Sequence, residues 1–181
     1  MKKALVVIDM QMYAQDRLDG GRDHVNGDAA VKIAALAAKF RENGDTVIHV
    51  HHGDPNPASP MHPGAPAQRV IQGLEPLRGE PVFVKSTSSP FASTDMENYL
   101  RDNRIDTLVV TGAVAGYCVN TTVRVGSDLG FKMIVVRDAV VGFDLPDENL
   151  SARVIFDVSM AHLKSDFANV VDSAEIITPL E

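Results

Sequence analysis

Residues 107–118 read TLVVTGAVAGYC, and this stretch decides the predicted fold. Its first five residues form a short run rich in β-branched side chains, as is typical of a buried strand. A turn containing Gly112 and Gly116 follows, and a helix is predicted to begin near Cys118 and to end at Leu129, before Gly130. A strand that leads through a turn into a helix is the repeating unit of a parallel sheet covered by helices.

The same alternation runs along the whole chain. Strands are predicted at 3–10, 46–51, 81–85, 107–111 and 132–137, with a further candidate at 169–171. Val and Ile occupy both faces of most of these strands, as expected of strands buried on two sides. The other helices are predicted at 29–43, at 94–103, where Thr94 and Glu97 match a capping box, and at 148–163. We therefore expect one domain over residues 1–181, with a three-layer α/β/α fold and a mostly parallel sheet of about six strands.

Two loops interrupt this pattern. Residues 53–79 are rich in Pro and Gly and lack periodicity, which is typical of a functional loop or an oligomer contact. Residues 138–146 are predicted as a second loop after the fifth strand.

Composition narrows the choice of partners. The chain has 181 residues, and its net charge of −7 and scattered Lys and Arg residues argue against nucleic acid. No window approaches the roughly 20 apolar residues that cross a bilayer, so no membrane is expected. The start MKKALVVID lacks a signal cleavage site and is interpreted as a strand. A single cysteine cannot form an internal disulfide, and together these features predict a cytoplasmic protein.

Reactive side chains follow three of the predicted strands. Asp9 closes the first, Lys85 closes the third, and Cys118 follows the fourth. Because active sites of open α/β sheets lie outside the carboxyl ends of the strands, these three groups are expected to meet. The helix N-terminus and Lys85 would favour the Cys118 thiolate. Asp9 could take the thiol proton or pass a proton to the leaving group. Backbone N–H groups of the turn at 112–118 could hold an oxyanion, so the pattern predicts acyl transfer to cysteine followed by hydrolysis.

The chain also resembles the isochorismatase-like cysteine hydrolases. The likeness includes DMQ at 9–11, Lys85 and GAVAGYCV at 112–119, in the family's order. It extends to Thr121 and Thr122 and to residues 128–131, 137–139, 161–163 and 167–171. Any one of these pieces is a weak signal, but the ordered set is specific.

The resemblance implies a catalytic triad of Asp9, Lys85 and Cys118, with an oxyanion hole formed by the N–H groups of Val114 and Cys118. It also implies a cis peptide bond between Ala113 and Val114. Isochorismatases proper cleave a vinyl ether and lack the cysteine, so its presence favours an amide, carbamoyl or other C–N bond in a small-molecule substrate. No cofactor is expected. The resemblance also implies a homo-oligomer, either a dimer or a tetramer.

Residues beside the triad are candidates for substrate contacts, and they are Gln11, His52, Phe91 and Tyr117. His49, His51 and His52 lie out of register with the metal site of nicotinamidase-like members, so no metal is expected. Gly112 and Gly116 do not form the Gly-x-Gly-x-x-Gly pattern of a dinucleotide site. The helix at 122–127 departs from its relatives, which leaves open a catalytically idle protein that serves in binding or as a scaffold.

Overall fold

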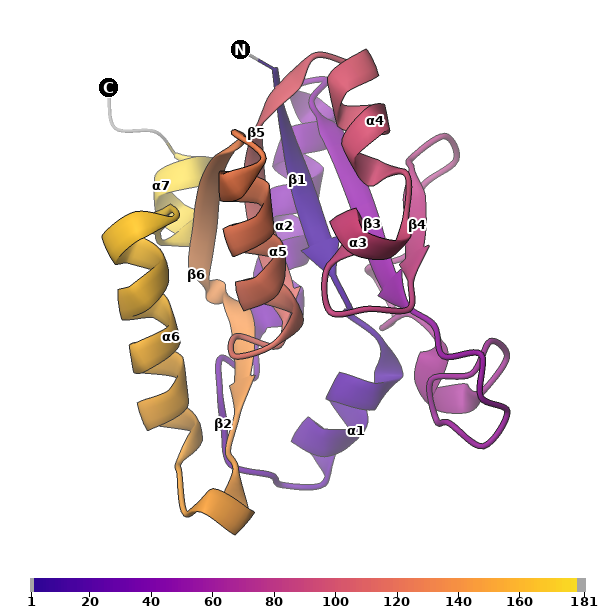
Figure 1. Ribbon diagram of the computed structural model, residues 1–181, viewed down its shortest axis with the longest axis vertical. Coiled ribbons are helices and arrows are strands. Elements are labelled where there is room, and N and C mark those ends of the chain that lie inside the picture. The colour runs from indigo at the N-terminus through magenta and orange to yellow at the C-terminus, as the bar shows by residue number, and fades with distance from the viewer. Residues whose placement is uncertain (1, 179–181) are drawn as a thin grey trace.

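The computed structural model describes residues 2–178 and shows a three-layer α/β/α fold (Figure 1). Its sheet has the strand order β2-β6-β5-β1-β3-β4, and β7 pairs with β6. All pairs are parallel except β2 with β6. The strands are β1 (Lys2–Ile8), β2 (His24–Val25), β3 (Thr46–His52), β4 (Val82–Lys85), β5 (Ile105–Ala113), β6 (Lys132–Phe143) and β7 (Asn169–Val171). The mostly parallel three-layer prediction is confirmed, and the short β2 is the strand that the sequence did not reveal.

Helices cover both faces of the sheet (Figure 1). Side chains from α4, α5 and α6 build the core on one face, and α1, α2 and α7 contribute to the core on the other. The helices are α1 (Met12–Asp19), α2 (Ala29–Glu42), α3 (Pro90–Ser93), α4 (Met96–Asp102), α5 (Cys118–Asp128), α6 (Ala152–Asp166) and α7 (Ser173–Ile177), with 3₁₀ turns η1 (Pro66–Gln68) and η2 (Pro146–Glu148). No helix within residues 2–178 combines the length and hydrophobicity that a membrane span requires.

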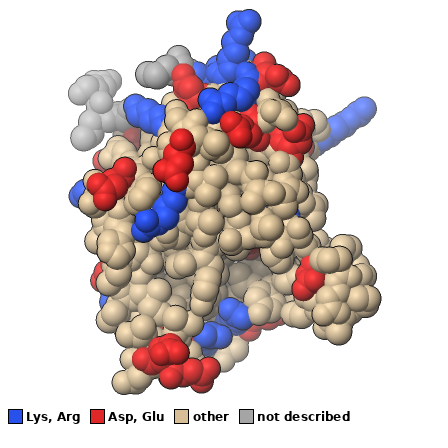
Figure 2. All heavy atoms as spheres, in the orientation of Figure 1, with Lys and Arg blue, Asp and Glu red and all other residues tan. Residues whose placement is uncertain are grey.

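The central strand β1 shows how the sequence builds this core. Val6 and Ile8 point into the core beneath α4, α5 and α6, whereas Leu5 and Val7 point into the core beneath α2. Successive side chains of a strand face opposite sides, so the run at 4–8 must be apolar throughout. Figure 2 shows the outer surface over α5 and α6, where charged residues gather toward the ends and the middle is largely uncharged.

Edge position explains one departure from the prediction. In β4, Val82 and Val84 are 42% and 53% exposed, because this strand pairs only with β3 and ends the sheet. The apolar run at 81–85 therefore belongs to an edge strand, with only Lys85 fully buried at its carboxyl end.

Three local predictions are wrong. Residues 138–143 continue β6 instead of forming a loop, because β5 and β2 both pair with them after a register shift. Thr94 and Glu97 do not form a capping box: Asp95 occupies the N-cap of α4, and the Thr94 hydroxyl donates to the Pro90 carbonyl and accepts from the Met96 N–H. The last long helix starts at Ala152, since residues 146–148 form η2.

Candidate active site

Three chain segments bring Asp9, Lys85 and Cys118 together at the carboxyl edge of the sheet. Asp9 follows β1, Lys85 ends β4, and Cys118 is the first residue of α5. Lys85 Nζ lies 2.8 Å from Asp9 Oδ2 and 3.3 Å from Cys118 Sγ. The Lys85 side chain is wholly buried, so its charge is balanced by these neighbours and not by water.

Lys85 has a third neighbour in His52, whose Nδ1 lies 3.1 Å from Nζ. Burial, and then the charge of Lys85, lower the pKa of His52 below its ordinary value. The imidazole is therefore neutral at physiological pH, and its Nδ1 can accept a hydrogen bond from the ammonium. With Asp9, Cys118 and His52 as acceptors, the three N–H donors of Lys85 are all occupied.

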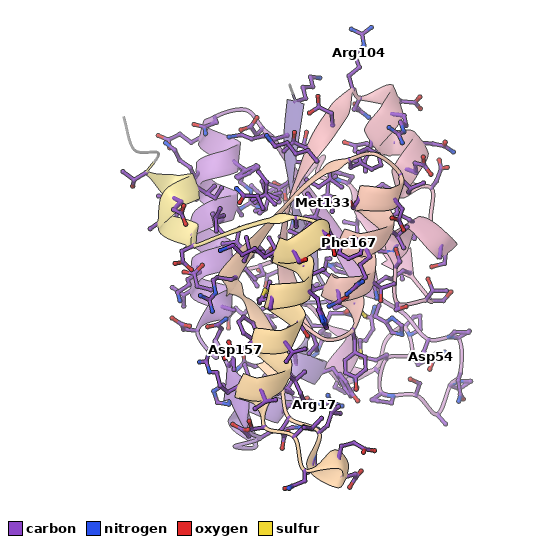
Figure 3. All side chains as sticks on the ribbon, turned by 60° about the vertical axis from the view of Figure 1, so that its left-hand side comes forward. Arg17, Asp54, Arg104, Met133, Asp157 and Phe167 are labelled. Atoms are coloured by element: carbon purple, nitrogen blue, oxygen red, sulfur yellow. The ribbon has the colours of Figure 1, made fainter. Side chains whose placement is uncertain are left out.

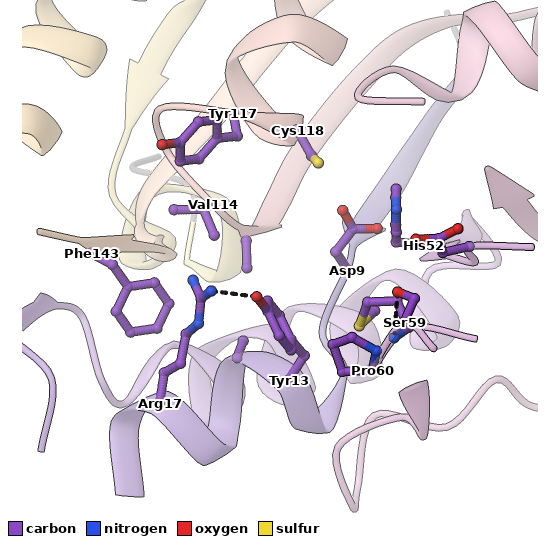
Figure 4. Close-up of a pocket in the computed structure, with 14 residues that line it drawn as sticks. Asp9, Tyr13, Arg17, His52, Ser59, Pro60, Val114, Tyr117, Cys118 and Phe143 are labelled. Carbon is purple, nitrogen blue, oxygen red and sulfur yellow. Dashed lines mark hydrogen bonds between the residues drawn. The ribbon is translucent and has the colours of Figure 1, made fainter. Parts of the chain in front are cut away.

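Asp9 is held in an uncommon backbone conformation. Its φ is +50°, and its N–H donates to the Val50 carbonyl at 2.8 Å. Oδ2 accepts a hydrogen bond from Lys85. Oδ1 is buried, and no donor among residues 2–178 binds it. Figure 4 shows the carboxylate and the Cys118 sulfur turned toward one another at the cavity wall. An unsatisfied carboxylate oxygen beside a thiol is suited to take its proton.

The thiol itself departs from the sequence-based expectation. Burial, and next the negative charge of Asp9, raise the pKa of Cys118 to about 11, although Lys85 acts in the opposite direction. The expectation that the helix N-terminus and Lys85 make a stable thiolate is therefore wrong. The raised pKa favours the thiol over the thiolate at neutral pH, so a nucleophilic step has to include transfer of the thiol proton to a base.

The turn between β5 and Cys118 is shaped by a close backbone approach. Gly112 has φ +117°, and a Cβ atom there would lie 2.0 Å from the Ile8 carbonyl oxygen. Only glycine fits this contact, which brings the turn against the end of β1 and hence near Asp9. The peptide bond between Ala113 and Val114 is cis. Across residues 2–178, neither the Val114 nor the Cys118 N–H finds a backbone acceptor.

A cavity of about 360 Å³ opens beside the triad (Figure 4). Its volume is at the small end of the range for small-molecule sites. The strand ends, α1, the long loop and the cysteine turn all contribute to its wall. The lining residues are Asp9, Tyr13, Ala14, Arg17, His52, Asp54, Ser59, Pro60, Met61, Ala113, Val114, Tyr117, Cys118 and Phe143. The loop at 53–79 thus forms one wall of the cavity, as a functional loop would.

Residues 3–175 match the model of the isochorismatase domain. The chain belongs to the isochorismatase family. An uncharacterized isochorismatase family protein of Bacillus subtilis, YrdC, is 32% identical over 97% of this chain and 95% of its own. A solved isochorismatase-family structure from Chromobacterium violaceum superposes with a TM-score of 0.90 at 32% identity, covering 97% and 92% of the two chains. N-carbamoylsarcosine amidase of Arthrobacter is 43% identical over 67 residues, which is 37% of this chain and 25% of the amidase.

Two of the four predicted substrate-contact residues, His52 and Tyr117, line the cavity. Gln11 does not, because it is fully buried and its amide is occupied by backbone groups. Its Nε2 donates to the carbonyls of His52 at 3.1 Å and Gln68 at 2.7 Å, and its Oε1 accepts from the His52 N–H at 2.8 Å. Gln11 therefore fastens the long loop to the end of β3.

Phe91 is also absent from the cavity wall. Its ring stacks on Phe131 with centroids 5.8 Å apart and packs against the core beneath α5. An aromatic residue close to the site in sequence is here a core residue. The cavity residues that the sequence did not suggest include Tyr13, Arg17 and Phe143; the first two share one face of α1, which has too few apolar residues to be recognised as a helix.

The histidines of β3 have separate environments. His49 Nε2 lies 2.9 Å from Glu80 Oε2, and Arg41 binds both oxygens of the same carboxylate at 2.7 and 2.9 Å. His51 packs edge-on against His49, whereas His52 faces Lys85. Residues 2–178 contain no group of three or more His, Cys, Asp or Glu side chains placed to hold a metal ion.

Proposed function

We propose that this isochorismatase-family hydrolase cleaves a C–N bond, of the amide or carbamoyl type, in a small molecule through a thioester on Cys118. The observation that carries the proposal is the position of Lys85 Nζ, within hydrogen-bond distance of both the Asp9 carboxylate and the Cys118 sulfur. The thiol therefore has a base to receive its proton and a cation to stabilise the sulfur as it becomes negative.

The arrangement supports a two-stage reaction. Asp9 Oδ1 takes the thiol proton as Sγ attacks the substrate carbonyl carbon, and the new oxyanion is held by the N–H groups of Val114 and Cys118. Asp9 then returns the proton to the leaving nitrogen, the C–N bond breaks, and a thioester remains. In the second stage Asp9 deprotonates a water molecule, which attacks the thioester, and the sulfur leaves and regains the proton as the acid is released.

The raised pKa of Cys118 sets the order of events. With this pKa a free thiolate would be scarce at neutral pH, so proton transfer and attack on the carbonyl occur together or in close succession. The proton stays within the triad as it moves from the sulfur to the Asp9 carboxylate, so the net charge of the triad does not change. Lys85 is within hydrogen-bond distance of both groups and stabilises the negative charge as it passes from the carboxylate to the sulfur.

The family relationship adds support for the bond type. N-carbamoylsarcosine amidase, to which the chain is 43% identical over 67 residues, is named for action on a carbamoyl-type C–N bond. The cysteine itself also favours this chemistry over vinyl ether cleavage, for which no nucleophilic thiol is needed.

The test is a search for the acyl-enzyme. Cys118 is the sole cysteine of the chain, so any thiol adduct must be on this residue. The protein is mixed with a panel of primary amides and N-carbamoyl compounds, and ammonia release is measured. The mass of the intact protein in rapidly quenched samples is determined by mass spectrometry. We expect ammonia release, and an adduct of acyl mass that is lost in Cys118→Ala. Absence of both across the panel, with a surface variant such as Lys39→Gln behaving as the parent, would count against the proposal.

A catalytically idle binding protein is the second candidate, and the raised thiol pKa is the observation that favours it. This alternative predicts that Cys118→Ala retains ligand affinity and that the parent never turns ligands over. The open cavity beside the thiol favours the hydrolase instead. The acyl-enzyme experiment separates the two.

A further inference from the structure

One positive charge in the cavity wall, that of Arg17, has no ion-pair partner among residues 2–178. Arg17 lies on α1 and is half-buried, with Tyr13 one helical turn before it. The guanidinium carbon lies 4.2 Å from the centroid of the Tyr13 ring and 5.8 Å from that of Phe143, and one N–H donates to the Tyr13 hydroxyl. These contacts hold the guanidinium against the apolar wall of the cavity (Figure 4).

The two carboxylates that share the cavity, Asp9 and Asp54, bind groups other than Arg17. Asp9 Oδ2 accepts from Lys85, and Asp54 Oδ1 accepts from the Asn56 N–H at 2.9 Å within the long loop. Within residues 2–178, no carboxylate oxygen lies within the 4.0 Å of Arg17 that would make an ion pair. Arg17 and Asp54 both lie at the end of the molecule opposite to Arg104 (Figure 3).

An unpaired guanidinium in a largely apolar wall has a definite chemical preference. It offers five N–H donors in a planar fork that matches the two oxygens of a carboxylate, and a single donor is used by Tyr13. Removing a cation from water without a counter-charge is unfavourable, so an anion is the ligand that satisfies the site best. The Tyr13 hydroxyl accepts from Arg17 and can in turn donate its own proton to the same anion.

We propose that Arg17 and the Tyr13 hydroxyl form a carboxylate-binding subsite, and that the substrates carry a carboxylate at the end remote from the scissile C–N bond. The assignment rests on the proposed function, because it takes Cys118 as the place where the bond is cleaved. Figure 4 places Arg17 and Tyr13 on the side of the cavity away from Cys118. A monoanion fits better than a phosphate, since the other cation of the site, Lys85, already binds Asp9.

The first experiment measures selectivity at the thiol and needs no hydrolysis. Cys118 is alkylated with the N-iodoacetyl derivatives of glycine, β-alanine and 4-aminobutyric acid, each as the free acid and as its primary amide. In every case the sulfur displaces iodide, forming a C–S bond and releasing the thiol proton to solvent. The measured quantity is the ratio of acid rate to amide rate, divided by the same ratio for N-acetylcysteine amide. This normalisation removes the intrinsic reactivity of each reagent.

The normalised acid-to-amide rate ratio is compared between the parent and three variants. Arg17→Gln removes the charge and the fork, and Arg17→Lys keeps the charge alone. Arg153→Gln makes the same charge change at an exposed position of α6 and is the matched control. We expect the parent and Arg153→Gln to favour the acid at least about ten-fold at one chain length. Arg17→Gln should return the ratio to the reference value, and Arg17→Lys should fall between.

The second experiment does not involve the thiol. The corresponding N-acetyl acids and N-acetyl amides are titrated into the parent and into Arg17→Gln, and affinity is followed by calorimetry or NMR. A preference of about ten-fold for the acid, lost in Arg17→Gln, is the expected result. If the parent shows no preference for acids at any chain length in either experiment, or if Arg17→Gln retains one, the subsite is refuted. If the preference is present but no amide is ever hydrolysed, the proposed reaction fails and the subsite stands.

Discussion

Replacing Asp9 by Asn should make Cys118 more reactive while abolishing turnover. Burial and then the Asp9 carboxylate raise the pKa of the thiol, and in the proposed mechanism the same carboxylate is its base, so the two consequences of losing it point in opposite directions. The substitution keeps the size of the side chain and its hydrogen-bonding oxygen near Lys85. A substitution that only disturbed the structure would not raise the rate of Cys118 alkylation while it lowered the rate of turnover.

The magnitude follows from the triad geometry. Lys85 Nζ is 2.8 Å from Asp9 Oδ2 and 3.3 Å from Sγ, so that oxygen and the sulfur cannot be more than about 6 Å apart. At an effective dielectric constant of about 20, two unit charges at this separation repel by roughly 3 kcal/mol, or about 2 pKa units. The thiol pKa should therefore fall from about 11 toward roughly 9. The thiolate fraction at pH 7.5 rises about a hundred-fold, and the lower nucleophilicity of the weaker base reduces the gain in rate to roughly ten-fold.

The assay is the rate of iodoacetamide alkylation from pH 6 to pH 11, with the parent and Asp9→Asn measured side by side. Hydrolysis of an amide substrate by the same preparations supplies the second readout, and Asp106→Asn, on the exposed outer end of β5, serves as the matched control. An unchanged or higher thiol pKa in Asp9→Asn would refute the electrostatic account of the site. Retained turnover would refute the role of Asp9 as the base.

Three further substitutions test parts of the structure around the site. Gly112→Ala should unfold the protein or lower its melting temperature strongly in a calorimetric scan, with a loss of roughly 3 kcal/mol or more, because the new Cβ would lie 2.0 Å from a carbonyl oxygen of β1. Gln11→Ala should cost about 2 kcal/mol in denaturant unfolding and raise KM, since three backbone groups of the loop anchor lose their partner. Burial opposes ionisation of Glu80, but hydrogen bonds from Arg41 and others outweigh it and lower its pKa to about 2. The ionised Glu80 thus stabilises the fold fully above its ordinary pKa of 4.5, and this contribution is lost as the pH falls toward 2; Glu80→Gln should flatten the dependence of unfolding free energy on pH in that window.

The sequence predicted well what short runs of residues determine by themselves. Each of the six predicted strands is present, because β-branched runs flanked by turn residues specify buried strands with little help from distant parts of the chain. The meeting of Asp9, Lys85 and Cys118 could be predicted for the same reason, since the carboxyl ends of parallel strands share one edge of the sheet.

What the sequence could not predict depends on contacts between distant segments. The roles of Gln11 and Phe91 are set by what packs against them, namely the long loop and Phe131, and their neighbours in sequence gave no sign of this. The pKa of Cys118 depends on burial and on the balance of two opposite charges, and both are set by the folded arrangement of distant segments. The second half of β6 is a strand because β5 pairs with it after a register shift and β2, a two-residue segment without any pattern of its own, pairs with its end.

Lys85, the ammonium of the proposed triad, lies at the end of a short edge strand of the sheet. β4 has four residues, pairs with β3 alone and exposes two of its valines, whereas Asp9 and Cys118 extend from β1 and β5 in the centre. Edge segments of this kind open locally at a lower free energy than the central strands do. Fraying of β4 would withdraw Lys85 while the rest of the molecule stayed folded, so warming should extinguish activity before it melts the helices and the central sheet. Under the proposed function, the time for which activity survives on warming would then depend on β4, and a substitution that stabilises this edge strand should lengthen it.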